Sequence, residues 1–247
     1  MFAGAPDIPP AELRENPHVP RSALVTGGSS GIGLAIARML RDEGYELTLA
    51  ARTQERLGTA AGALAAQGVQ ADLREEADCE RLLSAHRERF GSLDVLVNSA
   101  GLGIGSRIED LQAKHVDLQL DVNLRGLLLV TRAAIPMLKE AHGLIVNLSS
   151  LAGTVPGPGL SVYAATKAAV ISITHSLNAE LEADGVRATA LCPGFVDTPM
   201  TAWSGVPGER MIQPEDCAEV VRALLRLSPY ARIPAVVIER LGSGTGY

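Results

Sequence analysis

A tyrosine and a lysine stand four positions apart in the segment YAATK, at residues 163 and 167. In a helix, residues four apart lie on one face, about 6 Å from each other along the axis. The pKa of a free phenol is about 10, so it exchanges protons poorly at neutral pH. A fixed ammonium group nearby would stabilise the phenolate and lower that pKa. Tyr163 and Lys167 could then act as a general acid/base pair, although such pairs also occur by chance on helix surfaces.

A serine stands thirteen residues before this tyrosine, at the end of the apolar segment GLIVNLSS. The intervening segment AGTVPGPG is rich in turn-forming residues, so a strand could end at Ser150 and a helix could begin near Leu160. This arrangement would bring Ser150 and Tyr163 together at the carboxyl edge of a parallel sheet, where open α/β folds bind ligands. The neighbouring Ser149 would point to the other side, because side chains alternate along a strand.

A glycine-rich segment, TGGSSGIG at residues 26–33, follows a short apolar run and precedes a helical pattern. Glycines permit positive φ angles and let the backbone come close to a ligand. The N-terminus of the following helix offers free N–H groups and a partial positive charge to a pyrophosphate. A turn without a ligand is the alternative. The predicted strand before the turn and the predicted helix after it supply the context that a dinucleotide site requires.

Elements that could position these residues alternate along the chain. We predict strands in five short apolar segments: SALVTG, ELTLAA, LDVLVN, GLIVNLS and RATALCP. Helical spacing predicts helices after Gly31, at about residues 77–90, at about 113–140 and at about 160–183. Strands that are apolar on both faces and alternate with helices favour a parallel sheet covered on both sides.

The expected fold is therefore α/β, a single-domain Rossmann-type doubly wound parallel β-sheet flanked by helices. The chain has 247 residues, of which 47% are hydrophobic and 20% charged, and such a length can bury a substantial core. Neither an internal repeat nor a break in composition divides it. We expect residues 22–247 to form the dinucleotide-binding and catalytic domain, and the proline-containing residues 1–21 to form an extended N-terminal arm.

The charge balance excludes some classes of partner. Acidic residues outnumber basic ones by 28 to 22, which gives a net charge of −6 and argues against nucleic acid or an anionic membrane surface as the main partner. The three cysteines lack metal-binding spacing, and the N-terminus lacks the pattern of a secretory signal. With no apolar stretch long enough to span a membrane, we expect a cytoplasmic protein without a metal site.

Taken together, these motifs resemble the short-chain dehydrogenase/reductase family, whose glycine motif is TGxxxGxG. The resemblance runs from Ser22 to about Cys217 and weakens at the C-terminus, where IPAVVIER replaces the VDGG-like ending of many members. It implies an enzyme that interconverts a ketone and a secondary alcohol by hydride transfer. By similarity, Ser150 would hold the substrate carbonyl oxygen, Tyr163 would deliver or remove its proton, and Lys167 would bind the nicotinamide ribose and tune the tyrosine.

A fourth catalytic residue follows from the same resemblance. Asn123, in the segment LDVNLRG, matches the asparagine that holds a water connecting the lysine to solvent in the family. A buried amide in an otherwise apolar helix is costly unless its hydrogen bonds are satisfied, which also indicates a purpose. An asparagine that bends the helix or lies at an interface is the alternative.

The end of the second predicted strand, LAART, bears on the choice of cofactor. Sites for NAD place an acidic residue there for the ribose 2′-hydroxyl, whereas an arginine suits the 2′-phosphate of NADP. Arg52 occupies this region and no carboxylate does, so we predict NADP(H). An exposed strand-end arginine is the alternative. Ser30 also stands where many NADP-dependent members have a second basic residue.

Other positions would contact the cofactor by resemblance. Asp72 would accept a hydrogen bond from the adenine amino group, with capping of the next helix as a competing role. Asn98 would tie the sheet to the cofactor, and the segment PGFVDT would fix the nicotinamide carboxamide. The full predicted set is Gly27, Ser29, Ser30, Gly31, Ile32, Gly33, Arg52, Asp72, Leu73, Asn98, Ala100, Gly101, Tyr163, Lys167, Pro193, Gly194, Val196 and Thr198.

The substrate pocket is expected to be mostly apolar and to lie under a short lid between Thr198 and Pro214. By analogy it would be lined by Leu102, Ile104, Leu151, Phe195, Met200, Trp203 and Met211. An uncharged ketone or alcohol, or an acyl chain, fits such a pocket better than a multiply charged sugar phosphate. Arg210 could pair with a single carboxylate.

Two other functions are possible on this fold. A non-catalytic dinucleotide-binding sensor or scaffold would lack at least one member of the catalytic set, yet Asn123, Ser150, Tyr163 and Lys167 are all present. Enzymes that epimerise or dehydrate nucleotide sugars usually have a larger C-terminal substrate region. Apolar residues beyond one helical stripe, including those at 127–130, predict a homodimer or homotetramer.

Overall fold

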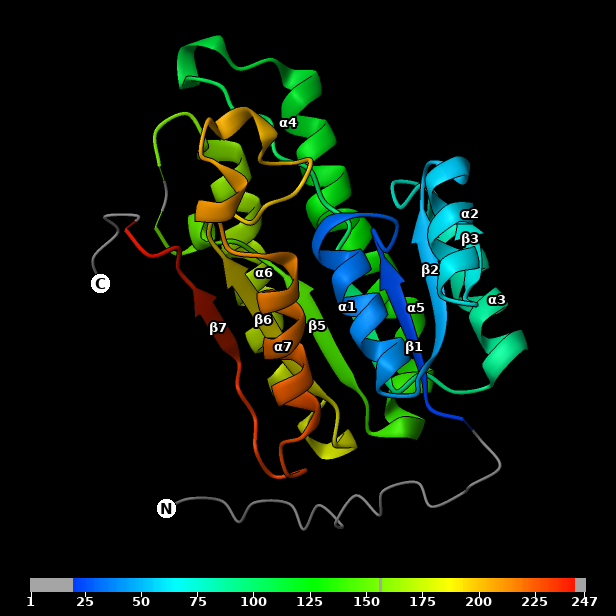
Figure 1. Ribbon diagram of the computed structural model, residues 1–247. Helices are drawn as coiled ribbons and strands as arrows, with labels where there is room; N and C mark the ends of the chain where they lie inside the picture. Colours follow the sequence, from blue (N-terminus) through cyan, green and yellow to red (C-terminus); the bar gives the residue numbers. More distant parts are fainter. Residues whose placement is uncertain (1–19, 156, 243–247) are drawn as a thin grey trace, which may run out of the picture.

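The structure, a computed structural model, describes residues 20–155 and 157–242. These residues form one seven-stranded sheet in which every paired strand is parallel, with the order β3-β2-β1-β4-β5-β6-β7 (Figure 1). The strands are β1 Ser22–Thr26, β2 Glu46–Ala51, β3 Gln67–Gln70, β4 Val95–Asn98, β5 Leu144–Leu148, β6 Arg187–Pro193 and β7 Ala235–Ile238. The order reverses between β1 and β4, as in a doubly wound fold, so the predicted fold class is confirmed.

Helices cover both faces of this sheet. They are α1 Gly31–Asp42, α2 Gln54–Ala63, α3 Glu76–Phe90, α4 Ala113–Leu120, α5 Leu127–Ala141, α6 Ser161–Glu180 and α7 Pro214–Leu225. Helices α1, α2 and α7 contribute to the core on one face, and α3 and α5 contribute to the core on the other. In Figure 1, α1 and α7 lie side by side in front of the sheet, and their residues are in contact.

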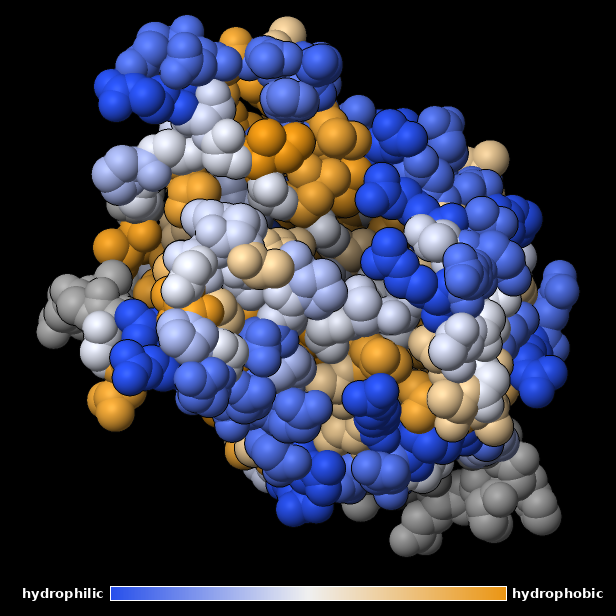
Figure 2. Space-filling model, turned by 45° about the horizontal axis from the view of Figure 1, so that its top comes forward, coloured by the Kyte–Doolittle hydropathy of each residue, from blue (hydrophilic) through white to orange (hydrophobic). Residues whose placement is uncertain are grey.

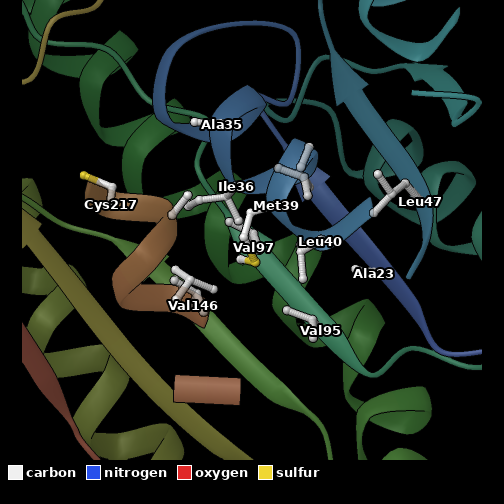
Figure 3. Close-up of a cluster of buried hydrophobic side chains, with 14 of the residues drawn as sticks. Ala23, Ala35, Ile36, Met39, Leu40, Leu47, Val95, Val97, Val146 and Cys217 are labelled. Carbon is white, nitrogen blue, oxygen red and sulfur yellow. The ribbon is translucent and has the colours of Figure 1, made fainter. Parts of the chain in front are cut away.

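The alternation of side chains along β1 shows how the two cores arise. Ala23 and Val25 face the core that contains α1, whereas Leu24 faces the opposite core, and all three are fully buried. Figure 3 shows Ile36 and Leu40 of α1 pointing toward the strands in the first of these cores. Burial of such apolar surface on both faces is the main stabilising contribution in a fold of this type.

One predicted helix is interrupted. The sequence predicted a helix over about 113–140, but α4 and α5 are separated by a single π-helical segment, Asp121–Gly126. A π turn adds one residue per turn to the helix and is frequent at functional sites. The segment contains Asn123, whose side chain is buried and hydrogen-bonded outside the helix. The interruption thus lies where the sequence predicted a catalytic residue.

The C-terminal part of the chain adds elements that the sequence analysis did not predict. Helix α7 covers the sheet, and β7 extends it beyond β6. Strand β7 comes from the IPAVVIER segment where the family resemblance is weakest. The predicted N-terminal arm lies outside the described residues except for Pro20 and Arg21, of which Arg21 donates to the Glu43 carbonyl oxygen at 2.6 Å.

The carboxyl ends of all seven strands lie at one edge of the sheet, at the top of Figure 1. The loops that leave this edge include the glycine turn after β1, the segment after β4 and the segment after β6. Within the described part of the chain, every helix is too short or too polar to cross a membrane.

Candidate active site

The serine, tyrosine and lysine predicted from the sequence converge at the carboxyl end of β5. Ser150 follows this strand, and Tyr163 and Lys167 lie in the first two turns of α6. The Lys167 Nζ atom lies 5.7 Å from the centroid of the Tyr163 ring and donates a hydrogen bond of 2.7 Å to the Leu148 carbonyl oxygen. The spacing of four residues therefore places the ammonium group beside the phenol, as the helical pattern predicted.

Ser150 is held with its hydroxyl toward the tyrosine. Its Oγ accepts a hydrogen bond from the Ala152 backbone N–H at 3.2 Å and donates a long one, 3.5 Å, to the Pro193 carbonyl oxygen. The Ser150 side chain also favours the ionised form of the Tyr163 hydroxyl. Ser149 points the other way and donates to the Lys167 carbonyl oxygen at 2.7 Å, which confirms the alternation argument for Ser150.

Burial controls the protonation of this cluster. Desolvation lowers the pKa of Lys167 to about 8, because its charged form is removed from water. Desolvation also raises the pKa of Tyr163 above its usual value, while the hydrogen bond with Ser150 opposes the increase. The expectation that the lysine lowers the pKa of the tyrosine is therefore wrong for the net direction, since burial of the phenolate outweighs the stabilising contacts.

Asn123 ties the π-helical segment to the loop after β4. Its Oδ1 atom accepts from the Leu102 N–H, and its Nδ2 atom donates to the Leu102 carbonyl oxygen, both at 2.9 Å. The same Nδ2 donates to the Thr166 hydroxyl at 3.1 Å, and this hydroxyl donates to the Tyr163 carbonyl oxygen at 2.7 Å. The asparagine thus positions both the loop and the turn of α6 that holds the catalytic pair.

A first pocket, of about 170 Å³, lies between the glycine turn and the ends of β2 and β3. Its lining combines backbone-exposing small residues with two arginines: Gly27, Ser29, Ser30, Ala50, Ala51, Arg52, Thr53, Arg56, Ala71, Asp72, Leu73, Ala100, Gly101 and Val122. Helix α1 begins beside it, and neither a capping side chain nor an acidic residue neutralises its first turn. These features suit a phosphate-bearing ligand.

A second pocket, of about 640 Å³, lies on the other side of the loop after β4. Its lining is mostly apolar: Gly103, Ile104, Gly105, Ser150, Leu151, Ala152, Val155, Gly157, Leu160, Tyr163, Gly194, Phe195, Met200, Thr201, Trp203 and Arg240. Gly103 packs flat on the tyrosine, because a Cβ there would come within 3.2 Å of the Tyr163 ring. Figure 2 turns this edge toward the viewer and shows hydrophobic residues gathered on it, bordered by hydrophilic ones.

The two pockets are arranged as a nicotinamide dinucleotide requires. Gly101 lines the first pocket and Gly103 lines the second. The two pockets therefore adjoin along the loop after β4. A Cβ at Gly101 would lie 3.4 Å from the Lys167 Nζ atom, which places this ammonium group at the junction. The only acidic side chain lining the first pocket among the described residues, Asp72, is paired with Arg74 at 2.6 Å. The residues present therefore fit an anionic dinucleotide.

The family comparison decides the assignment. A model of the short chain dehydrogenase family matches residues 21–205, which include the glycine turn, Asn123, Ser150, Tyr163 and Lys167. The chain belongs to the short-chain dehydrogenase family. It is accordingly an oxidoreductase with the Rossmann-type fold.

Other short-chain dehydrogenases align along nearly their whole length. An uncharacterised oxidoreductase from Staphylococcus aureus strain MRSA252 is 36% identical over 220 residues, covering 87% of this chain and 95% of the relative. A solved alcohol dehydrogenase from the archaeon Thermococcus sibiricus, complexed with 5-hydroxy-NADP, matches with a TM-score of 0.86 and 32% identity, covering 92% of this chain and 99% of that one. A solved 3-ketoacyl-(acyl-carrier-protein) reductase from Brucella melitensis, complexed with NADH, matches with a TM-score of 0.82 and 31% identity, covering 89% and 96%.

Most positions that the sequence assigned to the cofactor lie along the two pockets of this short-chain dehydrogenase. Those lining the first pocket are Gly27, Ser29, Ser30, Arg52, Asp72, Leu73, Ala100 and Gly101, and those lining the second are Tyr163 and Gly194. Thr198 packs beside Gly31, since a Cβ at that glycine would come within 3.1 Å of the threonine methyl group. Ile32 follows in the first turn of α1.

Four other residues predicted to contact the cofactor line neither pocket, and the structure shows their packing contacts. Gly33 packs α1 against the glycine turn, because a Cβ there would lie 2.5 Å from the Gly27 carbonyl oxygen. The buried Asn98 donates to Thr131 at 3.0 Å and to Asn147 at 2.9 Å, so it links neighbouring elements beneath the pockets. Val196 is buried, and Pro193 lines neither pocket, although its carbonyl oxygen accepts from Ser150.

The competing role suggested for Asp72 is wrong. Helix α3 begins at Glu76 with Glu75 as its N-cap residue, so Asp72 stands too early to cap it. The Asp72 carboxylate instead forms an ion pair with Arg74, and this contact lowers the pKa of Asp72 below its usual value. Its position in the first pocket remains compatible with adenine recognition.

Most residues predicted to line the substrate pocket lie together along the second pocket. Ile104, Leu151, Phe195, Met200 and Trp203 all line the second pocket. The structure does not place Leu102, Met211 or Arg210 in that lining. Leu102 instead exchanges backbone hydrogen bonds with the Asn123 amide.

Two arginines in these pockets were missed. Arg56 lines the first pocket from α2, one turn after Arg52, and Arg240 lines the second pocket from the end of β7. The signal for Arg56 was its spacing of four residues from Arg52, which fits one helical turn. The signal for Arg240 was its position two residues after the apolar run AVVI, because residues that follow a parallel strand reach the ligand-binding edge.

Proposed function

We propose that this protein is an NADP(H)-dependent oxidoreductase that interconverts a ketone and a secondary alcohol. One observation carries the proposal: Ser150 and Tyr163 meet on the wall of an apolar pocket, with the Lys167 ammonium group 5.7 Å from the phenol ring. This arrangement suits the activation of a carbonyl oxygen that has little charge of its own.

Each of the four catalytic side chains has a separate role in the proposed reaction. A bound NADPH supplies the hydride to the carbonyl carbon, and NADP⁺ accepts it in the reverse direction. The Ser150 hydroxyl holds the carbonyl oxygen, and the Tyr163 hydroxyl gives this oxygen a proton as the alcohol forms. Lys167 holds the cofactor ribose and stabilises the phenolate that is left, before a proton from solvent restores the phenol. Asn123 keeps the loop and α6 in position through its three hydrogen bonds.

The protonation states favour a particular order of events. Because the pKa of Tyr163 is raised, the residue is a phenol at neutral pH and is ready to donate its proton to a carbonyl. Because the pKa of Lys167 is lowered only to about 8, its side chain is mostly an ammonium ion at pH 7. Reduction therefore starts from the resting protonation states, whereas oxidation requires the phenolate and should accelerate as the pH rises.

The preference for NADP(H) rests on Arg52 and Arg56, which line the first pocket at the end of β2 and the start of α2. Two guanidinium groups that line the same pocket can both reach a ribose 2′-phosphate. In the described part of the chain neither guanidinium forms an ion pair within 4 Å. The 2′-phosphate would supply the missing partner for both.

We also propose that the protein acts in the cytoplasm as a homodimer or homotetramer. Leu120 at the end of α4 and Leu128 at the start of α5 are 41% and 46% exposed, so these helices retain apolar surface that a second subunit could cover. The described cysteines, Cys79, Cys192 and Cys217, are all free, as expected in a reducing compartment.

The test is an activity panel of ketones and secondary alcohols, each assayed with NADPH or NADP⁺ and with NADH or NAD⁺, by following the absorbance of the reduced nicotinamide. We expect turnover of at least one apolar ketone, with a higher kcat/KM for NADPH than for NADH. Tight NADPH binding without turnover of any pair would instead favour the dinucleotide sensor. Equal kcat/KM for the two cofactors would contradict the assignment of the arginines.

A further inference from the structure

The substrate pocket contains one charged side chain among its described residues, that of Arg240. The remaining side chains of the lining are apolar or uncharged, with Phe195 and Trp203 among the largest. A cation in a largely apolar wall loses hydration and needs an acceptor in compensation. This guanidinium is therefore the feature of the pocket most able to select one class of substrate.

The fold places Arg240 close to the reacting groups. Strand β7 pairs with β6 so that Ile238 lies opposite Pro193, whose carbonyl oxygen accepts from the Ser150 hydroxyl. The Gly194 N–H donates to the Ile238 carbonyl oxygen at 2.8 Å, and a Cβ at Gly194 would lie 3.6 Å from the Arg240 backbone nitrogen. The backbone of Arg240 thus lies beside Gly194, the residue after Pro193, and the Pro193 carbonyl oxygen accepts the hydrogen bond from Ser150.

Among the described residues, the Arg240 guanidinium has only weak partners. Its Nη1 atom donates to the Leu241 carbonyl oxygen at 3.3 Å, and its Nη2 atom donates to the Gly242 carbonyl oxygen at 3.4 Å. Both distances are longer than the usual 2.7–2.9 Å of a charge-assisted hydrogen bond. The Nε atom is buried and lacks an acceptor among the described residues. An anionic oxygen in the pocket would be a stronger acceptor for the two terminal nitrogens than these carbonyl oxygens.

We propose, building on the ketone–alcohol reaction above, that Arg240 binds a carboxylate of the substrate. The substrates are then oxo acids and hydroxy acids in which an apolar chain carries the reacting carbon. The planar guanidinium matches the two oxygens of a carboxylate, and the pocket of about 640 Å³ accommodates the attached hydrocarbon.

The charges around the pocket favour a carboxylate over a phosphate. A phosphate monoester carries nearly two negative charges at neutral pH and would need several donors, whereas Arg240 is the single cation in the described lining. The net charge of the whole chain is −6, so long-range attraction cannot hold a highly charged substrate here. A single negative charge is therefore matched by the single positive charge of the pocket.

Matched acids and esters test this assignment by kinetics. We would assay the reduction of benzoylformate, benzoylacetate and benzoylpropionate, together with their methyl esters, which differ in the distance between the ketone and the acid. The wild type should prefer at least one acid over its own ester. In Arg240→Met, kcat/KM for that acid should fall about ten- to hundredfold, mainly through KM, while kcat/KM for the ester changes less than about threefold.

Two further variants control this experiment. Arg210→Met removes an arginine between β6 and α7 that is absent from the pocket lining, so the preference for the acid should persist. Arg240→Lys keeps the charge without the fork of donors and should recover part of the lost activity. Equal losses on acid and ester in Arg240→Met, or no loss on the acid, would overturn the assignment. Inactivity of the wild type on every ketone would instead count against the proposed function itself.

A binding measurement separates the two possible failures, because it requires no turnover. Phenylpropionate and phenylpropionamide have similar shapes, but only the first is charged at pH 7. Calorimetry on the NADP⁺-loaded protein should show tighter binding of the acid in the wild type and equal, weak binding of both ligands in Arg240→Met. Emission from Trp203, the only tryptophan in the chain and part of the pocket wall, reports that the acid binds there. Equal affinities for the acid and the amide in the wild type would refute the proposal.

Discussion

Among the described residues, one basic side chain is buried at each end of the sheet, and the two side chains have different surroundings. At the amino end, His86 is fully buried, and its ring nitrogens contact the Thr48 hydroxyl and the Ser92 carbonyl oxygen, both at 2.8 Å. At the carboxyl end, Lys167 is 6% exposed and bonds to the Leu148 carbonyl oxygen beside the pockets. The first group is enclosed by partners, whereas the second lies where ligands would bind.

The same physical effect has opposite consequences at the two ends. Burial lowers the pKa of His86 to about 4, so the imidazole is neutral at physiological pH. Burial lowers the pKa of Lys167 to about 8, which leaves the amine mostly charged at pH 7 and close to its titration point. Desolvation therefore makes the histidine inert and brings the lysine into the range where proton transfer is useful. The predictions below test this contrast, from the largest expected effect to the smallest.

The largest effect concerns the acid/base group at the carboxyl end. Tyr163→Phe removes the hydroxyl that exchanges the proton, so kcat should fall about 10²- to 10⁴-fold, while NADPH affinity stays within about threefold. Tyr230→Phe, at a site 67% exposed, is the matched control and should leave kcat unchanged. Steady-state kinetics and fluorescence titration of NADPH measure the two quantities. A kcat within tenfold of the wild type would remove Tyr163 from its assigned role.

At the amino end, His86 should make stability depend on pH. Its folded-state pKa of about 4 lies below the usual 6.5, so the unfolded chain takes up the proton first as the pH falls. The stabilisation is complete above pH 6.5 and is lost between pH 6.5 and 4, by about 3 kcal/mol in the free energy of unfolding. His86→Gln should lack this loss, and His175→Gln, at an exposed site, should keep it. Urea unfolding at several pH values measures the difference, and parallel curves for wild type and His86→Gln would contradict the prediction.

Lys167 should show the corresponding effect at alkaline pH. Its folded-state pKa is also lowered, from 10.5 to about 8, so the unfolded state binds the proton more tightly between these values. As the pH rises from 8 to 10.5, the free energy of unfolding of the wild type should increase by about 2–3 kcal/mol relative to Lys167→Met. Comparison with the variant cancels the titration of other groups. A difference that does not change with pH would show that the buried amine is better solvated than its contacts indicate.

A smaller effect is expected at the first pocket. Arg52→Ala should weaken NADPH binding about ten- to hundredfold by removing charged hydrogen bonds to the 2′-phosphate, with NADH affinity changed less than about threefold. Arg38→Ala, on the exposed side of α1, serves as the control. Equal losses for NADPH and NADH would show that Arg52 does not distinguish the cofactors.

The smallest expected effect belongs to Arg56. It lies one helical turn beyond Arg52 in the same pocket, so Arg56→Ala should weaken NADPH binding about two- to fivefold, again without an effect on NADH. The double variant Arg52→Ala/Arg56→Ala measures whether the two guanidinium groups act on the same phosphate. If the losses in the free energy of NADPH binding of the two single variants add up in the double variant, the two guanidinium groups act independently.

Much of the carboxyl end could be predicted from the sequence, because its residues follow directly from regular elements. Ser150 stands two residues after a five-residue buried strand, and Tyr163 and Lys167 share one face of a helix, so alternation and helical spacing were enough to place them together. The sheet was predictable for a similar reason, since the central strands β1, β4 and β5 each contain three consecutive apolar residues.

Other features were hidden because they depend on contacts between distant segments. The hydrophobic pattern over residues 113–140 fits one helix, and nothing in it distinguishes a π turn from an α turn. Arg240 was missed because the apolar run before it is only four residues long and becomes a strand through pairing with β6. The direction of the Tyr163 pKa required the extent of burial, which spacing does not reveal.

The extra residue in the π-helical segment has a consequence for engineering. Deleting any one position between Asp121 and Gly126 would let α4 and α5 merge into a regular helix, and local backbone hydrogen bonding would improve. Because the π turn accommodates one extra residue, α4 and α5 would keep their relative orientation, whereas the side chains within the segment would point in new directions. The Asn123 amide would then leave Leu102, and the loop that forms the junction of the two pockets would lose its anchor. A more regular helix here would give a less active protein.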